Sequence, residues 1–351
     1  MISGLEKAAE ERPELIDRVM RRAISALSEE PQQLSPDDLR RVFTDASGNP
    51  YGDWLYELIL YAKGEFDKTG KKRFCGNPIF VHTLGTMLRV HEQTAQAYSS
   101  WSKLEDVLEH EHRDVVLAAA ALHDLREDCP VPRRDLKARL EYTKAPHTDY
   151  LLKATDTLTK KSAKRRAITH VLRMGASLLT PVNELLSKKP EFNERRYKVY
   201  INRIFRKAYE GFNAGDPLHD AAVIAKLADA IDNLETVPQV AFNPGLYERV
   251  LRKTVMIKHR ARNFAETTQN PFVALLIERL ERSESSLETY LNNELGRGIN
   301  GLNNYVQLNQ PRAPDLPARY TGTVSAAIRD VNSLLRIIGA GRNGGPKTDG
   351  R

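Results

Sequence analysis

The chain of 351 residues contains 53 Lys and Arg against 46 Asp and Glu, a formal net charge of +7, and 41% of its residues are hydrophobic. This apolar share excludes a wholly disordered chain, and the longest apolar run, around residues 115–122, is far too short to span a membrane. Charges within residues 1–12 leave no apolar core for a signal peptide, and two cysteines, Cys75 and Cys129, cannot form a disulfide framework. We therefore expect a soluble cytoplasmic protein.

Apolar residues recur at helical spacing from the start of the chain, which predicts helices near residues 15–27 and 54–61. Another helix is predicted after Ser35, a suitable N-cap residue that precedes a proline. Residues 114–128 indicate one strongly apolar helix that turns polar at its C-terminal end. Alternating β-branched runs joined by Asn-Gly turns do not occur in the sequence, so we predict an all-α fold.

The predicted elements divide into a central domain, residues 50–265, and three flanking parts. Residues 1–49 are expected to form an N-terminal helical extension, and residues 266–310 a C-terminal one. A leucine stripe in the latter is expected to pack on the main domain or on a second subunit; it consists of Leu276, Leu280, Leu287 and Leu291. Residues 311–351 are expected to form a Pro/Gly-rich linker, a short helix and a disordered basic tail.

The segment from Lys160 to Glu210 is strongly basic, with 14 Lys or Arg residues against 4 acidic ones. Two interpretations are open: a solvated helical face, or a patch that attracts a polyanionic ligand. Aromatic residues are not interleaved with these charges as a stacking platform would require, so we do not expect sequence-specific nucleic-acid binding.

The most informative residues are His123-Asp124, followed at once by Glu127-Asp128. Ionised carboxylates in apolar surroundings are costly unless a partner compensates their charge. On a continuous helix, a spacing of four would put Glu127 below His123 and Asp128 below Asp124 on the same side. One helix could then offer a nitrogen ligand and several carboxylates to one cavity. The alternative is a helix end that becomes polar as it reaches solvent.

Two further positions strengthen the metal interpretation. His82 lies in an apolar stretch where a helix is predicted to begin after Pro78, and Asp229 lies inside another apolar helix. Each has an ordinary alternative, a satisfied core histidine or a local hydrogen-bonding aspartate. Two histidines and two aspartates from separate helices form a mixed nitrogen and oxygen site suited to Mn²⁺, Fe²⁺, Co²⁺ or Zn²⁺. By contrast, the His110-x-His112 pair lies among charged residues and indicates a solvated face.

This pattern resembles the HD superfamily of metal-dependent phosphohydrolases. The wider context resembles the alarmone (guanosine tetra- and pentaphosphate) hydrolase domain of RelA/SpoT-type proteins and of stand-alone small alarmone hydrolases. Three ordered runs carry the resemblance, which spans about residues 51–259: Arg-x-x-Gly-x-Pro-x-x-x-His at Arg73–His82, His-Asp-x-x-Glu-Asp at His123–Asp128, and Lys-Leu-Ala-Asp-x-x-x-Asn at Lys226–Asn233. Two positions depart from the family pattern: Thr83 stands where Pro is usual, and Asp232 where His or Tyr is usual.

The resemblance implies an HD-type helical bundle over residues 50–265 and hydrolysis of (p)ppGpp at its 3′-diphosphate, with release of pyrophosphate. It implies a divalent metal cofactor, expected to be Mn²⁺, held by His82, His123, Asp124 and Asp229. It also implies that Glu127 and Asp128 hold and deprotonate the attacking water, and that the nucleotide pocket is lined by Arg73 and Asn233. Four cations of the basic segment are candidates for holding a diphosphate: Lys160, Lys161, Arg195 and Arg196.

Two alternatives remain open at this point. One is an HD phosphohydrolase acting on another nucleotide, such as an NADPH phosphatase or a nucleotidase. The other is a helical scaffold that binds a nucleotide without turnover. We expect the chain to bind a nucleotide substrate and not a membrane. Whether it forms a homo-oligomer stays open.

Overall fold

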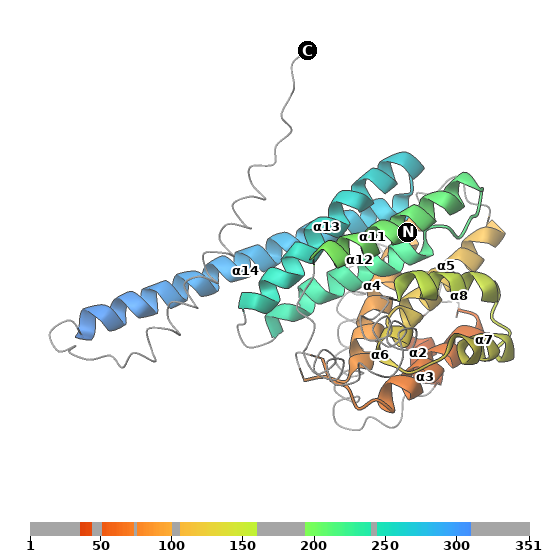
Figure 1. Ribbon diagram of the computed structural model, residues 1–351, viewed down its shortest axis with the longest axis horizontal. Coiled ribbons are helices and arrows are strands. Elements are labelled where there is room, and N and C mark those ends of the chain that lie inside the picture. Colours follow the sequence, from red (N-terminus) through yellow and green to blue (C-terminus); the bar gives the residue numbers. More distant parts are fainter. Residues whose placement is uncertain are drawn as a thin grey trace, which may run out of the picture.

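A computed structural model of the chain describes residues 36–43, 51–73, 76–99, 106–159, 194–239 and 244–309. These residues form helices and, apart from one isolated β-bridge between Lys72 and Pro78, contain no paired strands, which confirms the predicted all-α fold (Figure 1). The helix expected at 15–27, residue Ser35 and everything expected of 311–351 lie outside the described residues.

The described helices follow one another as α2 (Pro36–Val42), α3 (Asp53–Asp67), α4 (Ile79–Ser99), α5 (Asp106–Leu122), α6 (Leu125–Asp128), α7 (Arg133–Tyr142), α8 (Thr148–Leu158), α11 (Glu194–Asn213), α12 (Ala221–Thr236), the short 3-10 helix η2 (Val237–Gln239), α13 (Pro244–Thr268) and α14 (Pro271–Asn309). Helices α2, α3 and α4 begin where the turn residues and apolar spacing predict them. None of the described helices combines the length and the apolar character needed to cross a membrane.

Helix α12 occupies the centre of the bundle and packs against α4, α5, α8, α11, α13 and α14 (Figure 1). Its sequence is apolar on nearly every side, as expected of a fully enclosed helix, and Leu227, Ala228 and Ile231 are all inaccessible to solvent. Polar groups buried on such a helix need partners inside the protein. Three charged side chains of α12 are buried: Lys226, Asp229 and Asp232.

The apolar segment predicted as one helix over 114–128 is in fact divided. Helix α5 ends at Leu122, a turn carries His123 and Asp124, and the short helix α6 follows. Nδ1 of the His123 ring lies 2.7 Å from the Ala120 carbonyl, which in a continuing helix would accept the amide of Asp124. The side chain therefore competes with the backbone for that carbonyl, and the four-residue alignment of Glu127 below His123 is lost.

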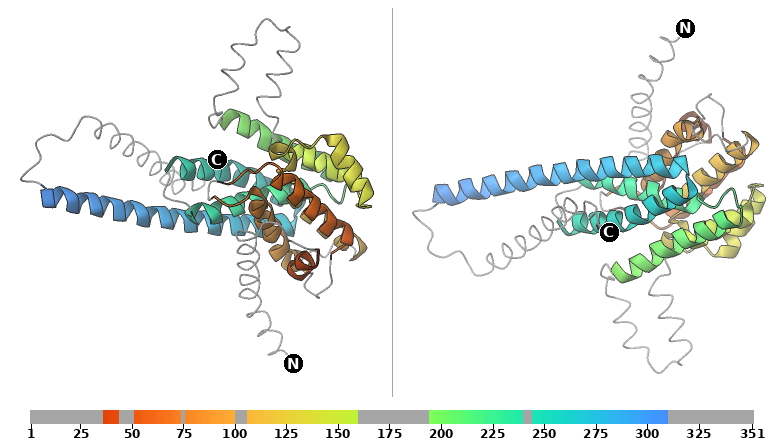
Figure 2. Two further views of the ribbon diagram at one scale, coloured as in Figure 1. Left: turned by 90° about the horizontal axis from the view of Figure 1, so that it is seen from below. Right: turned by 90° about the horizontal axis from the view of Figure 1, so that it is seen from above.

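Helix α14 carries the leucine stripe, and the stripe is buried within this chain. Leu276, Leu280, Leu287 and Leu291 are at most 1% exposed, and α14 packs on α4, α12 and α13. Figure 2 shows that α14 runs beside α12 and α13 and then continues past the other described helices.

Candidate metal centre

The segment before α4 fixes the position of His82. The amide of Arg73 donates to the Asn77 carbonyl at 2.8 Å, and the amide of Gly76 donates to Arg73 at 2.9 Å. Gly76 has φ +84°, a conformation that side chains with a Cβ rarely adopt. This turn delivers the chain to Pro78, after which α4 begins, so His82 lies in the first turn with a side chain only 2% exposed.

The turn between α5 and α6 presents the next two residues. His123 is 2% exposed, and its bond to Ala120 uses Nδ1, so Nε2 faces the interior. Asp124 lies at the start of α6 with a side chain 18% exposed. With the helix broken at this point, the side chains of His123 and Asp124 both lie beside His82.

Helix α12 supplies the fourth residue, Asp229, whose side chain is 7% exposed. Asn233, one turn later, donates to Asp229 Oδ1 at 2.7 Å. Lys226, one turn earlier, donates to the other oxygen of Asp229 and is itself buried. The i, i+3 and i+7 spacing puts all three side chains on one face of an otherwise apolar helix.

The four predicted ligands come together in the structure. One potential ligand atom from each of His82, His123, Asp124 and Asp229 lies within 4.8 Å of the others. Nε2 of His82 lies 3.2 Å from Nε2 of His123 and 3.0 Å from Asp229 Oδ1. Nε2 of His123 lies 3.2 Å from Asp124 Oδ2.

The short separations fit a shared divalent ion. Two others are slightly longer: His82 Nε2 lies 3.7 Å from Asp124 Oδ2, and His123 Nε2 lies 3.9 Å from Asp229 Oδ1. Ligand atoms about 2.0–2.2 Å from one ion lie about 3–3.5 Å from one another. Two imidazole nitrogens with two carboxylate oxygens also match the mixed donor set of Mn²⁺, Fe²⁺, Co²⁺ or Zn²⁺. The other ring nitrogen of each histidine is already occupied, by a backbone carbonyl at His123 and by Asp232 at His82, as is usual for histidines that bind metal.

Electrostatics in the cluster are dominated by its carboxylates. Burial disfavours protonation of His123, but Asp124 and Asp229 outweigh it and raise its pKa to about 9. Burial would raise the pKa of Asp229, yet Lys226 and His82 hold it well below its usual range. Burial likewise opposes the charge of Lys226, and Asp229 raises its pKa well above the ordinary value. The site thus favours the ionised form of Asp229 and the protonated forms of His123 and Lys226.

No family model, curated protein or solved structure matches this chain. The chemistry of the cluster must therefore be argued from its own residues.

The two predicted water-activating residues lie on α6, next to the cluster in sequence. Glu127 is exposed, and Asp128 has a side chain 25% exposed. Nζ of Lys71 lies 3.2 Å from Asp128 Oδ1 and also donates to the Asp128 carbonyl. Asp128 is therefore accessible to solvent and has the ammonium group of Lys71 beside it.

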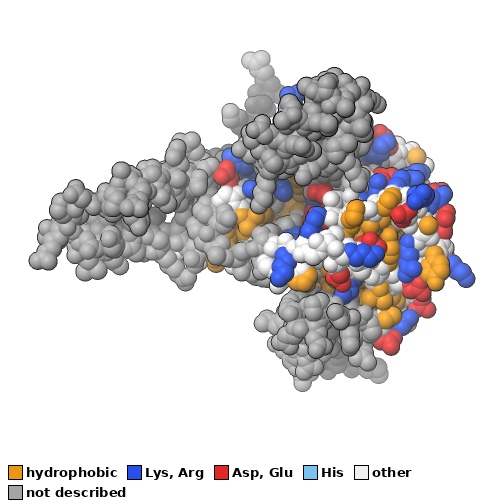
Figure 3. Space-filling view, turned by 60° about the horizontal axis from the view of Figure 1, so that its bottom comes forward, with side chains coloured by type: hydrophobic (Ala, Val, Ile, Leu, Met, Phe, Trp, Pro, Cys, Tyr) orange, Lys and Arg blue, Asp and Glu red, His pale blue; other side chains and the backbone are white. Residues whose placement is uncertain are grey.

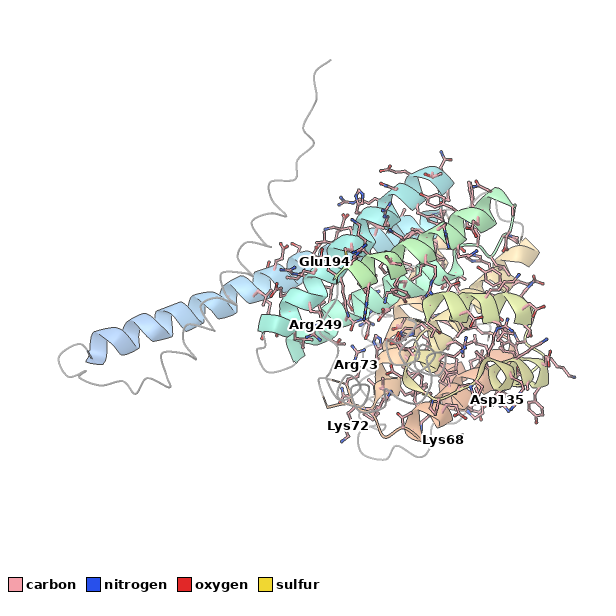
Figure 4. All side chains as sticks on the ribbon, viewed as in Figure 1. Lys68, Lys72, Arg73, Asp135, Glu194 and Arg249 are labelled. Carbon is pink, nitrogen blue, oxygen red and sulfur yellow. The ribbon has the colours of Figure 1, made fainter. Side chains whose placement is uncertain are left out.

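The predicted nucleotide-binding residues divide into three groups. Arg73 and Asn233 are joined by a direct hydrogen bond of 2.8 Å, and both are partly accessible. Arg195 and Arg196 are exposed in the first turn of α11. Lys160 and Lys161 lie outside the described residues. In the view of Figure 4, Arg73 lies between Lys72 and Arg249, and Glu194 marks the start of α11.

The described residues do not form a uniformly positive surface on the face shown in Figure 3. Lys and Arg side chains alternate there with Asp and Glu, and hydrophobic side chains lie between them. On α11, Lys207 and Arg206 both pair with Glu210, and Arg203 donates to the carbonyls of Thr157 and Thr159. Several of these cations therefore serve local structure.

Sequence reasoning missed two features of the described helices. The sequence analysis assigned no role to Lys226 or Asp232. Each lies three residues from Asp229 on an apolar helix, and this spacing places them near the same face. His112 was expected to be solvated, but it is 0% exposed and its Nε2 lies 2.7 Å from Asp220 Oδ1. That prediction was wrong because charge in this stretch does not mark an exposed face: Arg113, the next residue, is also buried, with its guanidinium 4.4 Å from the centre of the Tyr51 ring.

Proposed function

We propose that this chain is a metal-dependent phosphohydrolase of the HD type that removes diphosphate from the 3′ position of guanosine tetra- or pentaphosphate. The observation that carries the proposal is the convergence of His82, His123, Asp124 and Asp229, from three separate stretches of the chain, on one small volume. The choice of an alarmone over other nucleotides is supported by the three sequence runs around these residues, with Arg73 and Asn233 in the positions where the family binds its nucleotide.

The four residues would hold a divalent ion, with Mn²⁺ as our first expectation. An ion bound there would lower the pKa of the attacking water and withdraw charge from the phosphoryl oxygens. Lys226 adds a fixed positive charge behind Asp229. It partly balances the two aspartates and would oppose repulsion of a polyanionic substrate.

Asp128 is our candidate for the general base. Its carboxylate is partly exposed and lies beside Lys71, so a water molecule can reach it, as a general base requires. Glu127, one residue earlier and exposed, would orient the same water. Neither side chain belongs to the four-residue cluster. We therefore assign Asp128 and Glu127 to the water and not to the metal.

Arg73 is placed to recognise the nucleotide. Its guanidinium already bonds Asn233, so its position relative to the cluster is set before substrate arrives. A planar guanidinium can either pair with a phosphate or stack on a base. Arg195 and Arg196, exposed on α11, would contribute to holding the diphosphate.

A nucleotide panel tests the proposal directly. The purified full-length chain is incubated with Mn²⁺ and guanosine tetraphosphate, guanosine pentaphosphate, NADPH or deoxynucleotides, and the products are identified by chromatography and mass spectrometry. We expect GDP and pyrophosphate from the tetraphosphate. Asp124→Ala should abolish the reaction, whereas Asp135→Ala, on α7 with a side chain 48% exposed, should leave it unchanged.

Other outcomes contradict the proposal in distinct ways. Turnover of NADPH or a deoxynucleotide alone would keep the hydrolase and replace the substrate. Metal-stabilised protein that binds a nucleotide without forming any product would instead favour the non-catalytic scaffold.

A further inference from the structure

Asp232 makes a buried contact with one of the proposed metal ligands. Its Oδ2 lies 2.6 Å from Nδ1 of His82, and the two side chains are 4% and 2% exposed. Nδ1 is the ring nitrogen that faces away from His123, Asp124 and Asp229, because all their short contacts are made with Nε2. Asp232 therefore touches the back of the His82 ring.

The backbone of α4 makes room for this carboxylate at Gly85. A Cβ on residue 85 would lie 2.8 Å from Asp232 Cγ and 3.2 Å from Oδ2, and closer still to Oδ1. Glycine in a helix interior is unfavourable relative to alanine. Its presence three residues after His82, in a buried position, is explained by the space that Asp232 occupies.

A cation on the far side limits the cost of burying Asp232. The guanidinium of Arg89 approaches Asp232 Oδ1 at 3.9 Å and pairs with Glu235 at 2.6 Å. Glu235 is in turn paired with Arg279 on α14 at 3.1 Å. These ion pairs connect α4, α12 and α14. The Asp232 carboxylate therefore lies between the His82 ring and the Arg89 guanidinium.

We propose that Asp232 is a positioning residue: its carboxylate accepts a hydrogen bond from Nδ1–H of His82, so that the lone pair on Nε2 faces the side of Asp124 and Asp229. A carboxylate on the outer nitrogen fixes the ring and its tautomer and increases the basicity of the metal-binding nitrogen. The inference rests on the metal site of the proposed function and adds a residue at a position where the family pattern has His or Tyr.

Metal binding by the full-length chain, measured by calorimetry with Mn²⁺, tests this role without any substrate. Asp232→Asn removes the charge and keeps the shape, and we expect its Kd to rise about tenfold to a hundredfold. Gly85→Ala forces the carboxylate away from its place and should weaken binding in the same direction. Gly64→Ala is the matched control, because a Cβ at that helical glycine would meet nothing within 4 Å; its Kd should stay within twofold of the original.

A measurement on the unsubstituted chain keeps the inference testable if either variant fails to fold. With Zn²⁺ as a diamagnetic probe, ¹⁵N spectra of labelled histidines should show the proton of His82 on Nδ1. A proton on Nε2 would overturn the inference, as would a folded Asp232→Asn protein with unchanged affinity.

The outcomes separate the two proposals. Tight Mn²⁺ binding that weakens in Asp232→Asn, without hydrolysis of any nucleotide, would leave the positioning role standing and remove the proposed function. Failure of the original chain to bind a divalent ion would overturn both.

Discussion

Arg73 donates a 2.8 Å hydrogen bond to Asn233 Oδ1 across a separation of 160 positions. The amide of Asn233 donates in turn to Asp229 Oδ1, the oxygen that faces His82. Arg73 is thus connected through the Asn233 side-chain amide to the cluster that His82 forms with His123, Asp124 and Asp229.

Arg73→Ala should therefore impair substrate binding more than metal binding. Asn233 keeps its own bonds to Asp229, so we expect the Kd for Mn²⁺ to stay within about threefold. KM should rise about tenfold or more, because a charge-assisted contact to phosphate typically contributes about 1.5–3 kcal/mol. Arg134→Ala, at a side chain 91% exposed, is the control. Equal losses in both measurements would show that Arg73 supports the cluster itself.

Mn²⁺ should stabilise the folded chain. An ion that binds only the native state adds about 2.7 kcal/mol at a concentration of 100 times Kd, which a thermal melt will register as a higher Tm. Asp124→Ala or His123→Ala should remove this shift, because each deletes one of the four converging ligands. A melting curve of the unsubstituted chain that ignores Mn²⁺, Co²⁺ and Zn²⁺ alike would contradict a metal site.

Metal affinity should increase with pH. Burial disfavours the protonated His123 ring, but Asp124 and Asp229 raise its pKa to about 9, so a proton competes with the ion for Nε2 near neutrality. We expect the affinity for Mn²⁺ to rise by up to about tenfold per pH unit and to level off above pH 9. Calorimetry in two buffers with different ionisation enthalpies will count the released protons. A pH-independent affinity with no proton release would contradict this protonation state.

The free energy of unfolding of the metal-free chain should decrease with rising pH, whereas the metal affinity increases. Because the pKa of His123 is raised from 6.5 to about 9 on folding, its charge stabilises the native state fully below pH 6.5. That contribution is lost as the pH rises through 9. Urea unfolding of metal-free protein should show a lower free energy of unfolding at pH 9.5 than at pH 7, and His123→Gln should reduce the difference.

A second buried pair, His112 and Asp220, should matter for stability and not for metal binding. The atoms His112 Nε2 and Asp220 Oδ1 lie 2.7 Å apart, both side chains are 0% exposed, and Asn270 donates to the other carboxylate oxygen. Asp220→Ala would strand the buried imidazole, so we expect a loss of about 3–5 kcal/mol in urea unfolding. Glu141→Ala, which breaks the exposed pair with Lys137, should cost at most about 0.5 kcal/mol.

Apolar periodicity was enough to predict an all-α fold, the start of α4 after Pro78 and the apolar character of α12. It also singled out His82, His123, Asp124 and Asp229, because charged or metal-binding side chains are conspicuous inside apolar helices. These features depend on residues a few positions apart, and local spacing determines which face of a helix they share.

Contacts between distant helices could not be predicted in the same way. The burial of His112 against Asp220 and the contact between Asp232 and His82 each depend on how α4, α5 and α12 pack. His82 and Asp232 are 150 positions apart, and no helical period relates them. Only close packing, with Gly85 leaving space for a carboxylate, decides that they meet.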